Sequence, residues 1–78
     1  MINLTHGIER ELIIVIINGK EKKCQKNLSI KLLLDELNLS SQRLALELNG
    51  EIVPRSELDN TFLADKDKIE IISAIGGG

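Results

Sequence analysis

The last ten residues, 69–78, read Ile-Glu-Ile-Ile-Ser-Ala-Ile-Gly-Gly-Gly and decide how the chain is interpreted. An apolar, β-branched run stops at Ile75, and three of the six glycines of the protein follow it. Glycine has no Cβ and loses more conformational entropy on ordering than any other residue, so a triple-glycine end is not expected to pack. We therefore predict a last strand that feeds into a flexible tail, residues 76–78, which presents little more than backbone and a terminal carboxylate.

A frayed terminus is the plain alternative, since chain ends are often poorly ordered. The abrupt change in composition argues against it, because the apolar run meets the glycines with no linker between them. We therefore interpret residues 12–75 as one domain that holds this end in place. Residues 1–11 lack a clean period of two or of 3.6, and we expect them to form a loose extension.

Composition excludes several classes of function. The 78 residues suffice for one domain, and 42% of them are apolar, with Phe62 as the single aromatic residue. A net charge of −2 and the lack of aromatic rings to stack on bases argue against nucleic acid as a partner. No apolar run approaches the ~20 residues of a membrane span, and there is no signal-peptide pattern. The lone Cys24 cannot form an internal disulfide, so we expect the reducing cytoplasm and no membrane partner.

The first half of the chain predicts a hairpin. The aliphatic run Leu12–Ile17 is typical of a strand buried on both faces, and therefore central in its sheet. Asn18-Gly19 tolerates positive φ at both positions and is the strongest short hairpin signal. The lysine-rich residues 20–26 would return along an edge, where lysines discourage pairing with other chains. We expect Cys24 to point inward as a small apolar side chain.

Residues 27–39 change to a helical period. Four apolar residues fall at i, i+3, i+4 and i+7 and predict one buried helix face: Ile30, Leu33, Leu34 and Leu37. Ser29 or Asn27 is the expected N-cap. Asn38 suits the position after the C-cap, with Leu39 folding back beyond it.

The second half predicts two short strands and the last one. A polar loop, 40–43, precedes a strand Leu44–Leu48, the turn Asn49-Gly50 and a short edge strand 51–53 that Pro54 ends. Residues 55–63 are expected to hold a helical or 3₁₀ turn capped by Ser56. Three apolar side chains of this connection would close the core beneath the sheet: Leu58, Phe62 and Leu63. The last strand would be 69–74.

Together these elements predict an α+β fold, a mixed sheet of four to five strands with one helix across one face. The strand at 12–17 and the strand at 69–74 are too apolar to be edges, so they should lie side by side at the centre. Asp65 and Asp67, close in sequence, are interpreted as part of a solvated turn. His6 is the single histidine, which leaves no histidine cluster for a metal site.

Five sequence features match one family when they are taken together. They are the Asn18-Gly19 hairpin, the leucine helix, the stretch 46–55 (Leu-Glu-Leu-Asn-Gly-Glu-Ile-Val-Pro-Arg), the stretch 67–72 (Asp-Lys-Ile-Glu-Ile-Ile) and the glycine terminus. In these features the chain resembles the ThiS family, the sulfur carriers of thiamine biosynthesis, which have the ubiquitin-like β-grasp fold. Members of that family usually begin at the first strand, so residues 1–11 are additional.

The resemblance implies a carrier and not an enzyme. An adenylyltransferase related to ubiquitin-activating enzymes would use ATP and Mg to adenylate Gly78. Sulfur that comes from a cysteine desulfurase would replace AMP, and the resulting thiocarboxylate would supply a thiazole synthase. Gly76 and Gly77 would give clearance in the partners' channels, and Ala74 and Ile75 would contact a partner groove. The chain itself would hold no catalytic residue, no permanent cofactor and no metal.

Two other interpretations share the activation of the C-terminal glycine carboxylate. One is a molybdopterin-type sulfur carrier, although the strand before the glycines lacks the proline expected of that family's tail. The other is a ubiquitin-like modifier that is joined to protein lysines. A bare interaction domain with an incidental glycine tail is the third alternative.

Overall fold

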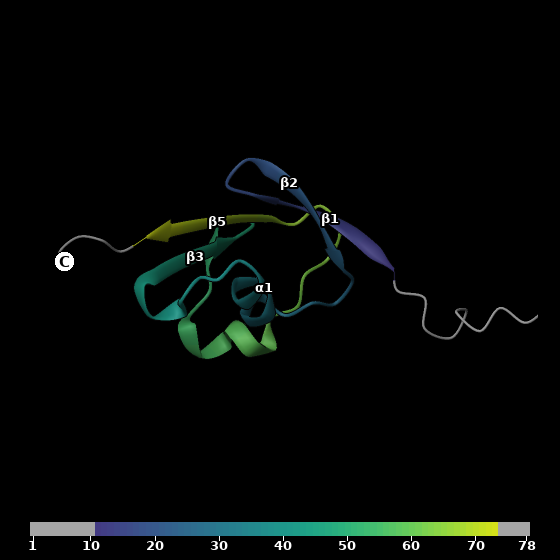
Figure 1. The fold of residues 1–78 in the computed structure, drawn as a ribbon. Coiled ribbons are helices and arrows are strands. Elements are labelled where there is room, and N and C mark those ends of the chain that lie inside the picture. The colour runs from purple at the N-terminus through teal and green to yellow at the C-terminus, as the bar shows by residue number, and fades with distance from the viewer. Residues whose placement is uncertain (1–10, 74–78) are drawn as a thin grey trace, which may run out of the picture.

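The computed structural model describes residues 11–73, which form a five-stranded mixed sheet with one α-helix against one face (Figure 1). The strands are β1 (Leu12–Ile17), β2 (Lys20–Gln25), β3 (Leu44–Leu48), β4 (Glu51–Ile52) and β5 (Lys68–Ser73). The helix is α1 (Ile30–Glu36), and two 3₁₀ helices, η2 (Ser41–Arg43) and η3 (Arg55–Asn60), lie in the connections. This is the α+β arrangement that the sequence predicts.

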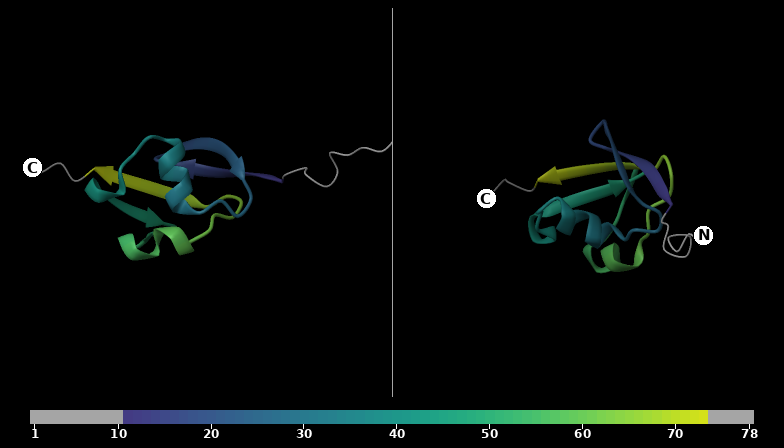
Figure 2. Two further views of the ribbon diagram at one scale, coloured as in Figure 1. Left: turned by 60° about the horizontal axis from the view of Figure 1, so that its bottom comes forward. Right: turned by 45° about the vertical axis from the view of Figure 1, so that its right-hand side comes forward.

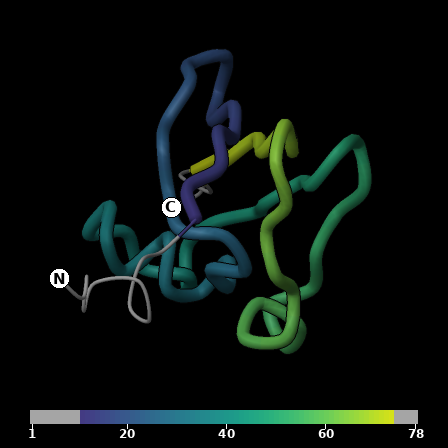
Figure 3. Tube along the Cα trace, turned by 90° about the vertical axis from the view of Figure 1, so that its right-hand side faces the viewer, coloured from purple at the N-terminus to yellow at the C-terminus, as the bar shows by residue number. Residues whose placement is uncertain are grey.

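The strand order is β2-β1-β5-β3-β4, so the last strand is the central one. The first and last strands lie side by side in parallel, as predicted, and the other neighbouring strands are antiparallel. The charged β2 and the short β4 are the two edges, and Pro54 follows β4 closely. In Figure 3 the β1–β2 hairpin reaches the top of the view and η3 lies at the bottom.

Both Asn-Gly pairs form the hairpin turns that were predicted. Asn18 and Gly19 have φ of 49° and 85°, and Asn49 and Gly50 have φ of 53° and 90°. Positive φ at both central residues matches the right-handed twist of the flanking strands. These turns fix the antiparallel registers of β1 with β2 and of β3 with β4.

The expectation that Leu12–Ile17 is buried on both faces is wrong. Ile13 and Val15 are buried, whereas Leu12 is 62% exposed and Ile14 is 36% exposed. The helix covers only one face of the sheet, and successive side chains of a strand point to opposite faces. An uninterrupted aliphatic run does not reveal which of its two faces is covered.

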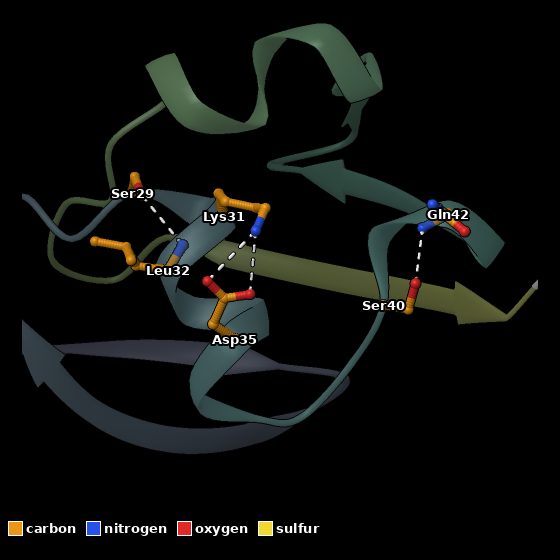
Figure 4. Close-up of polar contacts among 6 residues, drawn as sticks. All are labelled: Ser29, Lys31, Leu32, Asp35, Ser40 and Gln42. Atoms are coloured by element: carbon orange, nitrogen blue, oxygen red, sulfur yellow. Dashed lines mark hydrogen bonds and ion pairs between the residues drawn. The ribbon is translucent and has the colours of Figure 1, made fainter.

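Helix α1 begins and ends where the sequence predicts. The Oγ atom of Ser29 accepts a hydrogen bond from the N–H of Leu32 at 3.1 Å, so Ser29 is the N-cap and Asn27 is not (Figure 4). At the other end Asn38 has φ of 59°, and the N–H of Leu39 donates to the carbonyl of Leu34 at 2.9 Å. That bond reaches five residues back, from Leu39 to Leu34, which is the 6→1 pattern of a Schellman motif.

The exposed side of α1 carries one ion pair. Lys31 Nζ lies 3.2 Å from Asp35 Oδ1 at i,i+4 spacing (Figure 4). An exposed pair of this kind stabilises a helix by about 0.3–0.5 kcal/mol. The residues after the helix also show local capping, since the Ser40 Oγ atom accepts from the N–H of Gln42 at 3.2 Å. The predicted polar loop at 40–43 is therefore mostly the 3₁₀ helix η2.

The connection between β4 and β5 differs from the prediction in two details. It contains the 3₁₀ helix η3, as expected, but Pro54 and not Ser56 stands at the N-cap, with no side-chain cap bond. Leu58 and Leu63 are buried, whereas Phe62 is 56% exposed. Its backbone forms an isolated antiparallel bridge with Ser29, and neighbouring residues in an extended segment point to opposite sides. Burial of Leu63 therefore directs Phe62 outward.

The core lies between the sheet and the layer that α1 and η3 form on the same side of it (Figure 2). Its buried apolar residues are Ile13, Val15, Cys24, Leu28, Ile30, Leu33, Leu34, Leu46, Leu58, Leu63 and Ile69. All except Cys24 are aliphatic. Within residues 11–73 no buried side-chain nitrogen or oxygen lacks a hydrogen-bond partner. The helix stripe predicted from the 3.6 period is confirmed for three of its four members, and Leu37 packs against the core partly buried.

Candidate functional site at the carboxyl end of β5

The predicted site begins where the described structure ends. The five residues that sequence analysis selected follow Ser73, the last residue of β5, directly: Ala74, Ile75, Gly76, Gly77 and Gly78. They lie outside the described residues, so their roles stay predictions. The structure does show the base from which they start, the carboxyl end of the central strand (Figure 1).

On one side β5 is paired with β3 to its last residue. The antiparallel register runs from Leu48 opposite Ile69 to Leu44 opposite Ser73. The chain that carries the tail is therefore held in a continuous ladder up to the point where the tail begins. This ladder gives the carboxyl end of β5 a paired neighbour on its β3 side as far as Ser73.

On the other side the parallel pairing with β1 is short. It covers only Ile16 with Lys68 and Ile17 with Ile69, after which β1 turns away into the hairpin. The N–H of Asn18 still donates to the carbonyl of Ile69 at 2.9 Å. From there on, the Asn18 side chain takes the place of the missing strand.

The Asn18 amide bonds both backbone groups of Ile71. Its Oδ1 atom accepts from the N–H of Ile71 at 2.7 Å, and its Nδ2 atom donates to the carbonyl of the same residue at 3.2 Å. The Asn-Gly pattern predicts a turn at Asn18 and gives no sign of this second role. The partner lies 53 positions away in the chain, and only the tertiary fold brings it near.

Asn49 makes a similar arrangement at the opposite end of β5. Its Oδ1 atom accepts from the N–H of Lys68 at 2.9 Å, and its own N–H donates to the carbonyl of Lys68 at 2.8 Å. Its Nδ2 atom donates to Asp67 Oδ1 at 3.0 Å. Two hairpin asparagines therefore hold the backbone of β5, one at each end.

The two aspartates of the 65–67 turn are structural. Asp65 Oδ1 accepts from the N–H of Ile14 at 2.8 Å, and Asp67 Oδ2 accepts from the N–H of Ala64 at 2.8 Å. The expectation of a merely solvated turn is incomplete, because both carboxylates bind backbone N–H groups that the ladder leaves free. These contacts give the pair a role in entry to β5 and none in chemistry at its other end.

Apolar side chains lie beside the start of the tail on the sheet face away from α1. Ile72 is 51% exposed, and its register partner Ala45 is exposed on the same face. Next along this face Glu47 lies opposite Glu70.

Cys24 is not placed to act as a nucleophile. It is buried opposite Ile13, as predicted, and belongs to the core cluster. Burial raises the pKa of the Cys24 thiol, and the nearby Glu36 carboxylate raises it further, while Lys22 opposes the shift. The thiolate is the reactive form of cysteine, so this environment makes the side chain inert.

Residues 11–73 lack two features, a metal-binding cluster and a membrane-spanning helix. They contain no group of three or more His, Cys, Asp or Glu side chains placed to hold a metal ion. Over the same residues no helix is both long and apolar enough to cross a membrane.

Comparison with known proteins decides the family. The ThiS family matches this sequence over residues 15–78, which include all the strands except the start of β1, and also the glycine terminus. The chain belongs to the ThiS family. This is the family of sulfur carriers of thiamine biosynthesis, so the chain is assigned to that general function.

Individual relatives agree with the family. The sulfur carrier protein ThiS of Bacillus subtilis (strain 168) is 35% identical over 63 residues, 80% of this chain and 96% of that protein. The crystal structure of the thiamine biosynthesis protein ThiS from Geobacter metallireducens superposes with a TM-score of 0.75 at 30% identity, covering 85% of this chain and all of the other. The ubiquitin-like β-grasp fold expected from the sequence is thereby confirmed.

A third relative is much longer. A thiazole synthase of Paramagnetospirillum magneticum is 41% identical over 64 residues, which are 82% of this chain but 20% of that protein. A segment like this ThiS-family chain therefore occurs within a polypeptide that is named for thiazole synthesis.

Proposed function

We propose that this ThiS-family protein carries sulfur as a thiocarboxylate on Gly78 and donates it for thiazole formation. One observation supports the proposal most. The central strand of the fold ends at Ser73, and five residues ending in three glycines follow it. Those five residues can span about 16 Å at ~3.3 Å per residue. That reach allows the carboxylate to enter a partner's site while the folded domain stays outside.

The carboxylate must be activated before it can accept sulfur. A terminal carboxyl group has a pKa of about 3.3–3.7, so it is ionised at neutral pH and is a poor electrophile. In the proposed first step a carboxylate oxygen of Gly78 attacks the α-phosphate of ATP. The products are the acyl-adenylate and pyrophosphate. The enzyme for this step is an adenylyltransferase related to ubiquitin-activating enzymes, with Mg²⁺ bound to its ATP.

Sulfur then replaces the nucleotide. A cysteine desulfurase forms a persulfide, and a thiol reductant releases its outer sulfur as hydrosulfide while the thiol is oxidised to a disulfide. The hydrosulfide attacks the activated carbonyl carbon, and AMP leaves with the electron pair of the broken bond. The product is a terminal thiocarboxylate. Gly76 and Gly77 give clearance in the narrow channels this requires, since they have no Cβ. Ala74 and Ile75 contact the rim of the partner's groove.

The thiazole synthase is the proposed acceptor of the sulfur. The long relative from Paramagnetospirillum supports this partner, because a ThiS-like segment there shares a chain with a thiazole synthase. The carrier itself supplies no catalytic group, and both enzymes act on its terminus. We place all of these steps in the cytoplasm.

Intact mass spectrometry tests the proposal. The full chain is incubated with ATP, Mg²⁺, the adenylyltransferase of the same organism, a cysteine desulfurase with cysteine, and a thiol reductant. We expect a product in which one oxygen is replaced by sulfur, and no change when ATP is omitted. A ladder of conjugates to protein lysines would show a modifier instead. An unchanged mass with all components present would contradict the carrier function.

A further inference from the structure

The end of β5 is held unequally on its two sides. β3 pairs with it as far as Ser73, but β1 stops pairing at Ile69. Among residues 11–73, the hydrogen bonds on the β1 side that lie nearest the end of β5 come from the Asn18 side chain, which bonds Ile71 at 2.7 and 3.2 Å. It reproduces the donor and acceptor that one more residue of a neighbouring strand would provide.

We propose that Asn18 is a positioning residue for activation of the tail. By fixing Ile71, it sets the direction in which the chain leaves the sheet two residues later, and so where the carboxylate of Gly78 can reach. This inference rests on the proposed carrier function. Asn18 acts through Ile71 and does not itself touch the reacting atoms.

The conformation of Asn18 allows a clean test. Its φ of 49° is one that glycine adopts without strain, so Asn18→Gly keeps the turn and removes only the side-chain bonds. Asn18→Asp gives a second variant, since aspartate also tolerates positive φ and retains an acceptor for the Ile71 N–H. It lacks the donor for the Ile71 carbonyl.

Asn49→Gly is the matched control. Asn49 has nearly the same φ, 53°, lies in the equivalent Asn-Gly turn, and also holds β5 by its side chain. Its side chain bonds Lys68 and Asp67, at the end of β5 remote from the tail. A purely structural role for hairpin asparagines predicts similar effects of both substitutions on activation.

The experiment measures steady-state activation of each full chain by the adenylyltransferase with ATP and Mg²⁺, together with amide hydrogen exchange at Ile71. We expect Asn18→Gly to lower kcat by about fivefold to 150-fold, the range that two hydrogen bonds of ordinary net strength would give. The KM for the carrier should change less than about twofold, because the surface of the sheet is unaltered. The kcat of Asn18→Asp should lie between those of the native chain and Asn18→Gly, and Asn49→Gly should keep the native kcat.

Several results would overturn the inference. It is wrong if Asn18→Gly exchanges the Ile71 amide faster and yet keeps the native kcat. It is also wrong if Asn49→Gly lowers kcat as much as Asn18→Gly does, since the effect would then reflect general loosening of β5. If the unaltered chain itself is not activated, the proposed function fails, and the inference fails with it.

Discussion

Asparagine is the residue that ends elements in this protein. Asn18, Asn27, Asn38 and Asn49 all have positive φ, between 49° and 64°. Asparagine accepts this left-handed conformation at less cost than most residues with a side chain, and it offers an amide that glycine lacks. Two of the four use that amide to bind β5. At the scale of single residues, the same positions therefore turn the chain and anchor the strand that bears the tail.

Gly77→Val tests the need for clearance in the tail. A branched side chain would crowd a narrow channel and could not easily adopt positive φ if the bound tail requires it. We expect the rate of activation by the adenylyltransferase to fall about tenfold or more, while the circular dichroism spectrum stays native. Gly77→Ala should lie between the two. Equal activation of all three chains would show that the tail passes through no narrow site.

The buried thiol of Cys24 should make the free energy of unfolding fall as the pH rises in the alkaline range. Its folded-state pKa is raised above the usual 9.0, so the folded protein favours the neutral thiol. This contribution is fully present below pH 9 and is lost as the pH rises from the usual value through the higher folded value. Urea unfolding between pH 8 and pH 11 should show a steeper loss of stability for the native chain than for Cys24→Ala. Parallel losses in both chains would contradict the assigned environment.

At the scale of elements, helix α1 carries much of the core. Leu33 is fully buried, so Leu33→Ala should lower the free energy of unfolding by about 2–5 kcal/mol. Leu32 is the matched control, because it is the same residue type in the same helix and is 52% exposed. Leu32→Ala should cost less than about 0.5 kcal/mol. Urea denaturation of both variants measures the difference, and equal losses would mean that the helix phase is wrong.

The elements also show which parts of the fold could be predicted from sequence. Local signals sufficed for the hairpins and the helix, because Asn-Gly turns, the Ser29 cap and a 3.6-residue period act over a few residues. They did not suffice for Leu12 and Ile14, whose exposure depends on which face α1 covers. They also failed for Phe62, which faces outward because its neighbour Leu63 fills the core.

At the candidate site, local sequence signals predict the tail but not the side-chain contact that holds the strand before it. The glycine triplet predicts a tail from composition alone, and the family match covers these residues, but they lie outside the described part of the chain, so their roles stay predictions. The Asn18 contact with Ile71 could not be foreseen, because no local pattern pairs two residues 53 positions apart. The Asn18 side chain has this role because β1 stops pairing with β5 at Ile69, and that register is a property of the tertiary fold.

At the scale of the whole molecule, the described domain should fold without the segment that precedes it. The Glu11 carbonyl accepts from the N–H of Lys26 at 2.9 Å, so we place the cut after residue 10. The free energy of unfolding of a chain that starts at Glu11 should lie within about 0.5 kcal/mol of that of the full chain, because changes at the surface usually have effects of this size. The shortened chain should also be activated equally well. A truncated chain that fails to fold would show that Ile2, Leu4 or Ile8 belongs to the core.

The central claim is that the whole fold serves to deliver the carboxylate of Gly78 to an activating site. ATP–pyrophosphate exchange with the adenylyltransferase of the same organism tests it most directly, on the native chain, a chain lacking Gly78 and a chain with one added glycine. One extra residue moves the carboxylate by about 3.3–3.6 Å, and misplacement by ~1 Å can cost about a hundredfold in rate. We predict that both altered chains lose exchange at least a hundredfold while their circular dichroism spectra stay native. Exchange at the native rate by either altered chain would contradict the account.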